Sequence, residues 1–218
     1  GPNRITVRVE DRQDPYQPRG KQSSSGTPVR IYYYCTSGIW QNVWLEPVPA
    51  LRIDYLRVTE CRPDGTLALN VHLHGPSSDW QAELDVLDEL DSEQVVAQAH
   101  TSSHSACLEL RTQVPAPRPW SPSDPHLYKL RVRLLHRGQL VDTVESYAGL
   151  RSIELKDGWF HLNGERIFLL MALDQGYWPD TLLAAPNDEA LREDVLWAKR
   201  FGFNGVRKHQ KIEHERWL

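Results

Sequence analysis

Leu127 to Gly149 reads LYKLRVRLLHRGQLVDTVESYAG, two stretches of alternating apolar and polar residues that meet at Arg137-Gly138. Alternation with period two places apolar side chains on one face of a β-strand, and Arg-Gly is a turn signal. Five more stretches of this kind lie between Leu51 and Arg111, with turn signals such as Pro63-Asp64-Gly65. Seven short strands within about a hundred residues are typical of an immunoglobulin-like antiparallel sandwich. The sequence therefore predicts a complete β-sandwich over residues 51–150.

Residues 1–50 precede this domain and carry strand patterns at both ends. Residues 3–11 alternate apolar and polar side chains, and residues 30–48 are mostly aromatic and β-branched, with a turn at Ser37-Gly38. The polar, Gly-, Pro- and Ser-rich span between them predicts a long exposed loop. Two or three strands do not close a sandwich. We expect residues 1–50 to be the end of a β domain that begins before Gly1.

Residues 151–218 begin with a hairpin and continue with a strand, helix, strand pattern. Asn163-Gly164 is the signal of a type I′ hairpin turn. The apolar runs 167–173 and 203–206 predict two strands. Between them, Asn187 or Asp188 caps a helix that ends at Gly202. Strand, helix, strand is the repeating unit of a parallel α/β sheet or barrel.

Such folds place their chemistry at the carboxyl ends of the strands, where Asp174, Gln175, Arg207 and His209 lie in this chain. An arginine inside a sheet or barrel needs a carboxylate or an anionic ligand, so Arg207 is either a site residue or half of a structural ion pair. His209 could bind hydroxyl groups or be a solvated or core histidine. Asp174 and Gln175 could bind sugar hydroxyls or cap a loop.

Three aromatic residues also allow two interpretations. Trp120 lies in a Pro-rich segment before the sixth strand, and a packed corner is favoured there over ligand contact. Tyr177 and Trp178 follow the first strand of the α/β pattern and could stack on a sugar or pack the loop. Packing is favoured for this pair as well.

Composition argues against several other classes of protein. The net charge of -4 and the scattered Lys and Arg residues give no basic stripe for nucleic acid and no cationic face for a membrane. No apolar run approaches the ~20 residues that span a bilayer. The three cysteines lack C-x-x-C spacing, which predicts neither a zinc site nor a disulfide framework and favours a reducing, cytoplasmic compartment. His72 and His74 alone do not make a metal site. We expect no metal and no cofactor.

Five stretches together carry a family resemblance, and they follow one another along nearly the whole chain. They are SGIWQNVWLEPV (37–48), WSPSDPHLYKLRVRL (120–134), DGWFHLNGERI (157–167), LDQGYWPD (173–180) and FNGVRKHQ (203–210). This order resembles the family 2 glycoside hydrolases, the β-galactosidases, β-glucuronidases and β-mannosidases. The resemblance implies the tail of a jelly-roll domain (1–50), an immunoglobulin-like domain (51–150) and the opening of a (β/α)8 catalytic barrel (151–218).

The resemblance also implies where the chemistry lies. In that family two glutamates on later barrel strands act as acid/base and as nucleophile in a retaining reaction. The acid/base follows an asparagine, and no Asn-Glu pair occurs here, so both carboxylates are expected beyond Leu218 and none of the present residues is expected to be catalytic. Arg207 matches the arginine that supports the charge of the nucleophile. His209 departs from the pattern, because the family histidine lies three residues after the arginine and not two.

The resemblance implies that the chain is the non-catalytic centre of a retaining exo-β-glycosidase whose partner is a carbohydrate substrate; a homo-oligomer of the full-length protein is compatible with it. The rival from another class is a stand-alone immunoglobulin-like interaction or carbohydrate-binding module. Residues 157–218 argue against such a module, because their apolar strands would form the edge of an unfinished barrel. The sugar that is cleaved does not follow from these residues.

Overall fold

The computed structural model divides the chain into two units, one made of Glu46–Phe168 and the other of Gly1–Leu45 together with Leu169–Leu218. The residues that it describes are 3–12, 14, 16–17, 19–75 and 79–217.

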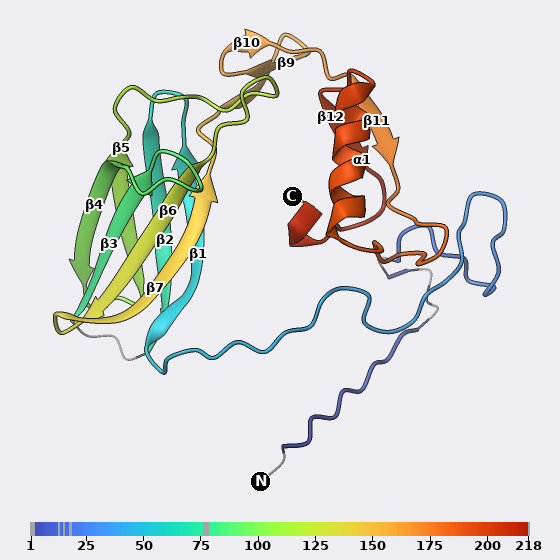
Figure 1. Ribbon diagram of the computed structural model, residues 1–218, viewed down its shortest axis with the longest axis horizontal. Helices are drawn as coiled ribbons and strands as arrows, with labels where there is room; N and C mark the ends of the chain where they lie inside the picture. Colours follow the sequence, from blue (N-terminus) through green and yellow to red (C-terminus); the bar gives the residue numbers. More distant parts are fainter. Residues whose placement is uncertain (1–2, 13, 15, 18, 76–78, 218) are drawn as a thin grey trace. The chain divides into compact units, whose positions relative to one another are not determined.

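The unit Glu46–Phe168 contains the predicted sandwich (Figure 1). One sheet has the order β1-β2-β5 and the other the order β4-β3-β6-β7, and all neighbouring strands are antiparallel. The seven strands are β1 Arg52–Cys61, β2 Thr66–His74, β3 Trp80–Leu87, β4 Val95–Ser103, β5 Cys107–Gln113, β6 Tyr128–His136 and β7 Gln139–Ala148. The prediction of an antiparallel β-sandwich is confirmed, and each predicted stretch forms one strand.

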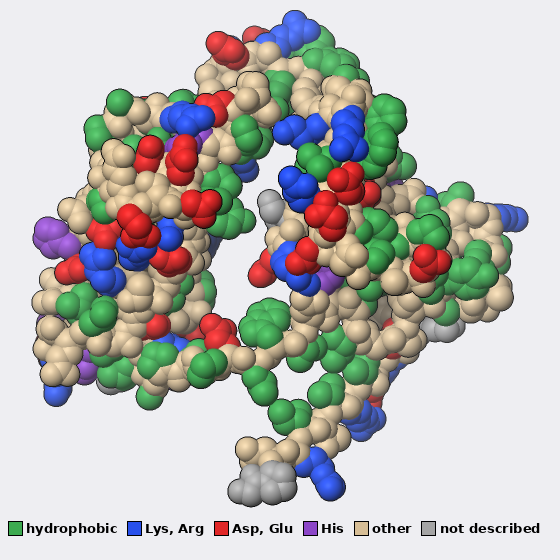
Figure 2. All heavy atoms as spheres, viewed as in Figure 1, with side chains coloured by type: hydrophobic (Ala, Val, Ile, Leu, Met, Phe, Trp, Pro, Cys, Tyr) green, Lys and Arg blue, Asp and Glu red, His purple; other side chains and the backbone are tan. Residues whose placement is uncertain are grey.

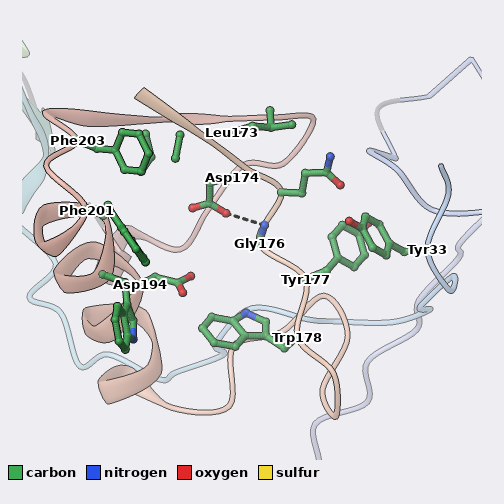
Figure 3. A pocket seen from close by; sticks show the side chains of 14 residues that line it. Tyr33, Leu173, Asp174, Gly176, Tyr177, Trp178, Asp194, Phe201 and Phe203 are labelled. Atoms are coloured by element: carbon green, nitrogen blue, oxygen red, sulfur yellow. Dashed lines mark hydrogen bonds between the residues drawn. The ribbon is translucent and has the colours of Figure 1, made fainter. Parts of the chain in front are cut away.

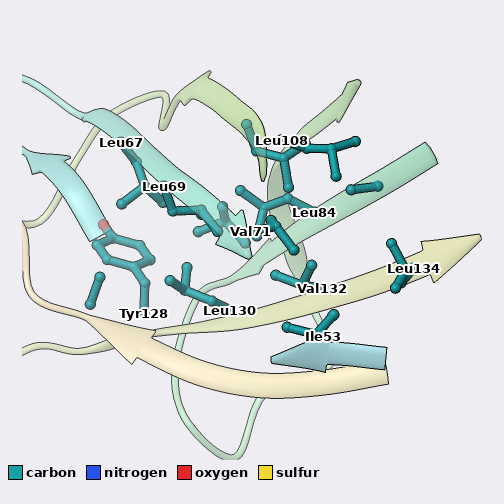
Figure 4. Packing of buried hydrophobic residues seen from close by; sticks show 14 of the residues in the cluster. Ile53, Leu67, Leu69, Val71, Leu84, Leu108, Tyr128, Leu130, Val132 and Leu134 are labelled. Atoms are coloured by element: carbon teal, nitrogen blue, oxygen red, sulfur yellow. The ribbon is translucent and has the colours of Figure 1, made fainter. Parts of the chain in front are cut away.

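Alternation along β6 shows how the sequence builds the core. Tyr128, Leu130, Val132 and Leu134 are buried, with at most 2% of each residue exposed, while the residues between them face outward. They pack against apolar side chains of both sheets, including Leu69 of β2 (Figure 4). Burying one such side chain contributes about 1.5–3 kcal/mol. The apolar face of each strand therefore gives this unit its own hydrophobic core.

The outer face of the β4-β3-β6-β7 sheet is covered by ion pairs. Arg131 pairs with Glu93 at 2.8 Å and with Glu145 at 3.0 Å. Arg133 bridges two carboxylates of β3. Figure 2 shows basic and acidic side chains interspersed over this unit. Pairs of this kind contribute up to about 1 kcal/mol each when exposed, so the apolar core dominates the stability of the sandwich.

A three-stranded hairpin sheet follows the sandwich: β8 Ile153–Lys156, β9 Trp159–Leu162 and β10 Glu165–Arg166. The predicted turn joins β9 to β10, with φ of 52° at Asn163 and 83° at Gly164, as a type I′ turn requires. The Asn163 side chain donates to the carbonyl of Trp120 and accepts from the backbone N–H of Ser152, both at 3.0 Å. Trp120 also stacks beneath the guanidinium of Arg151. The packed corner predicted at Trp120 is present.

The second unit contains β11 Met171–Asp174, α1 Asp188–Arg200, β12 Gly205–Lys208 and the 3₁₀ helix η1 Glu215–Trp217. β11 and β12 pair in parallel, with α1 between them in sequence. The Asn187 side chain caps α1 by accepting from the N–H of Ala190 at 2.8 Å. Gly202 follows the helix with φ of 80°, the left-handed conformation of a helix terminator. The predicted strand, helix, strand pattern is therefore present.

The strands predicted over residues 3–11 and 30–48 were wrong. Among the described residues, none before Arg52 belongs to a strand, and isolated bridges such as Gln22 with Tyr33 take their place. Ile5 and Val7 are 70% and 63% exposed, so their alternation meets no partner strand and no core. A strand pattern needs both before it becomes a strand.

In the described part of the chain, no helix combines the length and the apolar character needed to span a membrane.

Candidate functional site

The parallel pair β11-β12 sorts the strand-end side chains onto two faces. Leu173 lies opposite Arg207, and Asp174 lies opposite Lys208. Side chains alternate along a strand, so the first pair points to one face and the second pair to the other. Asp174 shares a pocket with Asp194 of α1, which places the second face on the side of the helix (Figure 3). Arg207 belongs to the face that α1 does not cover.

Arg207 and His209 lie together at the end of β12. Nη1 of Arg207 is 3.3 Å from Nδ1 of His209. A guanidinium only donates, so Nδ1 accepts and the proton of the neutral ring lies on Nε2. Desolvation and the positive charges of Arg207 and Lys21 lower the pKa of His209. The ring therefore offers an N–H donor beside two cations at neutral pH.

Asp174 forms an ion pair with Lys208 where β11 and β12 end. Its Oδ2 accepts from Lys208 Nζ at 2.7 Å, and its Oδ1 accepts from the N–H of Gly176 at 2.8 Å. Lys208 also reaches Glu213 at 2.9 Å and lies 4.6 Å from the ring centre of Trp217. Asp174 thereby holds together the ends of β11 and β12.

Lys211 extends this network into the loop after β11. Its ammonium donates to Glu213 at 2.9 Å, to the carbonyl of Leu183 at 2.8 Å and to the carbonyl of Gly176. These three acceptors use all three ammonium protons. Only 2% of the Lys211 side chain and 3% of the Glu213 side chain are exposed. The two lysines lower the pKa of Glu213 against the opposing effect of its burial.

A pocket of about 650 Å³ lies between β11, α1 and the loop after β11 (Figure 3). Three buried polar atoms at its lining residues have no hydrogen-bond partner in the described structure: Oε1 of Gln175, the hydroxyl of Tyr177 and Nε1 of Trp178. The ring of Tyr177 stacks on Tyr33 at 4.2 Å. This stacking shows the loop packing that the sequence favoured for Tyr177. The three polar atoms without a partner can bind water or hydroxyl groups.

The four predicted site residues therefore divide into two groups. The structure brings Arg207 and His209 together on the face without the helix, whereas Asp174 lies in the network on the helix side and Gln175 lines the pocket. Their roles in binding stay predictions. Lys208 was missed because only the register of β11 with β12 brings it to Asp174. Asp194 and Glu213 were missed because they come from α1 and from the loop after β12, and only the folded structure brings them to this network. Lys21 was missed because it lies far away in sequence.

Comparison with known proteins relates part of the chain to a family. The model of glycosyl hydrolases family 2 matches residues 51–151. A "Putative beta-glucuronidase" of Formosa agariphila is 29% identical over 215 residues, 95% of this chain and 24% of that protein. A "Beta-galactosidase" of Lactobacillus delbrueckii subsp. bulgaricus is 29% identical over 182 residues, 80% of this chain and 18% of that protein. The match over residues 51–151 and these relatives together support a fragment of a protein of glycosyl hydrolases family 2.

Solved structures of family 2 share the fold. The β-glucuronidase of Bacteroides uniformis superposes with a TM-score of 0.70 at 20% identity, covering 83% of this chain and 24% of that one. A family 2 member from Bacteroides cellulosilyticus gives a TM-score of 0.70 at 21% identity, covering 81% of this chain and 24% of that one. The chain thus spans about a quarter or less of the length of these family 2 relatives.

Proposed function

We propose that this chain is the non-catalytic centre of a retaining exo-β-glycosidase and forms one wall of its sugar site. The observation that carries the proposal is the pair of Arg207 and His209 at the carboxyl end of a parallel strand, in a chain of glycosyl hydrolases family 2. The two relatives are called a glucuronidase and a galactosidase, and both names denote enzymes that act on glycosides.

A retaining glycosidase needs two carboxyl groups about 5–5.5 Å apart, one as acid/base and one as nucleophile. In the proposal both come from sequence beyond Leu218. The exposed guanidinium of Arg207 would donate to the nucleophile and keep it ionised. The Nε2–H of His209 would donate to a sugar oxygen. Neither residue forms or breaks a bond to the sugar.

The apolar surface of the second unit supports a larger barrel. Met171 and Leu173 of β11 are 38% and 54% exposed, and Phe201 at the end of α1 is 71% exposed. Parallel sheets normally have both faces covered, and two strands are too few for independent stability. Further strands beside β11 and β12 would bury this surface. Residues 151–218 would then be the start of a (β/α)8 barrel, and residues 1–50 the end of a jelly roll.

The test compares the 218-residue chain with the full-length protein on 4-nitrophenyl β-glycosides. We expect the full-length protein to cleave at least one of them and to release the β-anomer first, as followed by proton NMR. The chain alone should be inactive. The proposal would be contradicted if the chain alone cleaves a substrate and loses this activity when one of its own carboxylates is changed. A full-length protein that binds sugars without cleaving them would favour the carbohydrate-binding module.

A further inference from the structure

The chain bends just after β12, at a residue whose backbone is strained. Gln210 follows His209 and has φ of 57°, in the left-handed region. This conformation is costly for a residue with a Cβ, so it persists only where surrounding contacts hold it, and such residues cluster at functional sites. The contacts that hold Gln210 therefore also fix the backbone next to His209.

One of these contacts comes from the beginning of the chain. Gly20 has φ of 65°, and a Cβ added to it would collide with the carbonyl oxygen of Gln210. The obstacle is backbone, which cannot turn aside as a flexible side chain can. Glycine therefore allows the two backbones to lie in direct contact, and a larger residue would force them apart. We call residues 19–41, which contain Gly20, the bracing segment.

The bracing segment also contacts the loop beyond this bend. The ring centre of Trp40 lies 5.3 Å from Nζ of Lys211 and 5.7 Å from the ring centre of His214. Nε2 of Gln41 donates to the carbonyl of Ile212 at 3.4 Å. The loop after β12 is thus held at several successive positions by one segment from the beginning of the chain.

The loop after β11 anchors the bracing segment at another point. The ring of Tyr33 stacks on Tyr177, with 18° between the ring planes (Figure 3). The backbone N–H of Tyr33 donates to the carbonyl of Lys21 at 2.8 Å, and its carbonyl accepts from the N–H of Ser23 at 2.9 Å. Lys21 directly follows Gly20. The stack therefore holds Gly20 in place through the backbone of the segment.

We propose that the bracing segment positions His209 for its contact with the sugar, and that Gly20 is the residue through which it does so. The inference rests on the proposed function, in which the Nε2–H of His209 donates to a sugar oxygen. The backbone N–H of His209 donates to the carbonyl of Asp174 at 2.8 Å, and the Gly20 contact fixes the residue that follows. Gly20 touches no substrate and acts through the backbone of Gln210. Its effect should therefore disappear when the side chain of His209 is removed.

The experiment measures kcat/KM of the full-length protein for the 4-nitrophenyl β-glycoside that the wild type cleaves best. Gly20→Ala should lower kcat/KM roughly 10- to 100-fold, because a displacement of about 1 Å at a site can cost about 10²-fold. In a His209→Ala background, the same change should lower it by no more than about threefold, because the group it positions is gone. Gly26→Ala is the matched control in the same segment. Gly26 has φ of 77°, and a Cβ there meets nothing within 4 Å, so this variant should keep the kcat/KM of the wild type.

A second set of variants tests the anchor without changing a glycine. Tyr33→Ala removes the stack on Tyr177 and should lower kcat/KM roughly 3- to 10-fold, again only while His209 is present. Tyr33→Phe keeps the ring and should restore the value of the wild type. Tyr34→Ala removes the neighbouring ring, which is 50% exposed, and should change nothing.

Three outcomes would overturn the inference while leaving the proposed function intact. They are the kcat/KM of the wild type in a folded Gly20→Ala variant, an equal loss in Gly26→Ala, and an equal loss with and without His209. The last would show that the bracing segment supports the fold without positioning His209. If Gly20→Ala does not fold, the same readings on Tyr33→Ala and its controls decide. A wild-type protein that cleaves no β-glycoside would contradict the proposed function and, with it, the inference.

Discussion

Asn163 shows how one residue can serve both a turn and a packed corner. Its backbone takes the left-handed conformation of the first position in the type I′ turn, and its amide links the turn to Trp120 and Ser152. Asparagine tolerates this conformation better than most residues because its short polar side chain forms local hydrogen bonds. The turn followed from Asn-Gly alone, but the two tertiary hydrogen bonds did not.

Asn163→Ala should destabilise the unit Glu46–Phe168 by about 2–3 kcal/mol, because it loses both hydrogen bonds and places alanine at positive φ. Asp157→Ala is the matched control. Asp157 has the same φ of 52° in the preceding turn, so alanine there costs only the conformational part, about 1 kcal/mol. Urea unfolding of both variants measures the difference. Equal losses would show that the amide contacts contribute nothing.

The strand-end residues mark the limit of prediction at the scale of single residues. Arg207 and His209 were identified because polar residues that follow an apolar run lie at the functional edge of a parallel sheet. The ion pair of Asp174 with Lys208 depends on the register of two strands separated by a helix. The effect of Lys21 on His209 depends on a tertiary contact that no local sequence pattern predicts. Spacing along the chain reveals neither.

At the scale of elements, Lys211 joins the loop after β12 to the loop after β11, and Glu213 balances its charge. Glu213 pairs with two lysines, and one of them, Lys211, is nearly fully buried. Removing one partner of a buried pair leaves an uncompensated charge, which costs about 3–5 kcal/mol. Glu213→Gln should destabilise the second unit by about that amount in urea unfolding. Glu189→Gln breaks an exposed pair in the first turn of α1 and should cost less than about 0.5 kcal/mol. Similar values for the two variants would show that the buried network does not stabilise the unit.

Asp194 of α1 makes the stability of the same unit depend on pH. Burial and the nearby Asp174 and Glu213 raise its pKa, against the opposing charges of Lys208 and Lys211. The folded state therefore keeps a proton that the unfolded state has already released, and stability falls as the pH rises above ~4, where an unfolded Asp ionises.

The side-chain amide in the Asp194→Asn variant does not ionise. The variant should match the wild type near pH 3.5 and become the more stable of the two as the pH rises toward 7. Asp180→Asn, a change at an exposed carboxylate in the preceding loop, should leave the pH profile unchanged. Unfolding free energies measured at several pH values test this. A variant that is less stable than the wild type at pH 7 would show that Asp194 is ionised and favourably paired.

At this scale, segments that have packing partners were predicted correctly, and segments without partners were not. Each of the seven stretches between 51 and 150 forms a strand, because each has neighbours and a core to face. The helix over Asp188–Arg200 was marked by its cap and its terminator. Residues 3–11 have the same period as a strand, yet Ile5 and Val7 are exposed. Periodicity reports what a segment can form when a partner is present.

At the scale of the whole molecule, the two units differ in how well they bury their apolar surface. The sandwich has a core of fully buried side chains, whereas the second unit exposes large apolar residues on β11 and around the end of α1. Within the 218-residue chain, amides of β2, β3 and β6 should exchange with deuterium at least ~100 times more slowly than those of β11 and β12. Equal protection would show that the second unit is self-sufficient, and it would contradict an unfinished barrel.

The family could be predicted from the order of five sequence stretches, and the comparisons agree with it. The assignment of residues 1–50 to a jelly roll and of residues 151–218 to a barrel stays a prediction. Both assignments concern how exposed segments pair with further strands, and those contacts are made by residues outside the present chain in the proposal. The sandwich could be predicted as a domain because its contacts are internal.

The turnover of the full-length Arg207→Ala variant on 4-nitrophenyl β-glycosides tests most directly whether this chain forms a wall of a glycosidase site. Loss of a preorganised donor to a charged catalytic group should lower kcat about 10²- to 10³-fold on every substrate that the wild type cleaves. Arg192→Ala, at an exposed arginine of α1, should retain wild-type turnover. Wild-type kinetics in a folded Arg207→Ala variant would contradict the placement of this strand end in the active site.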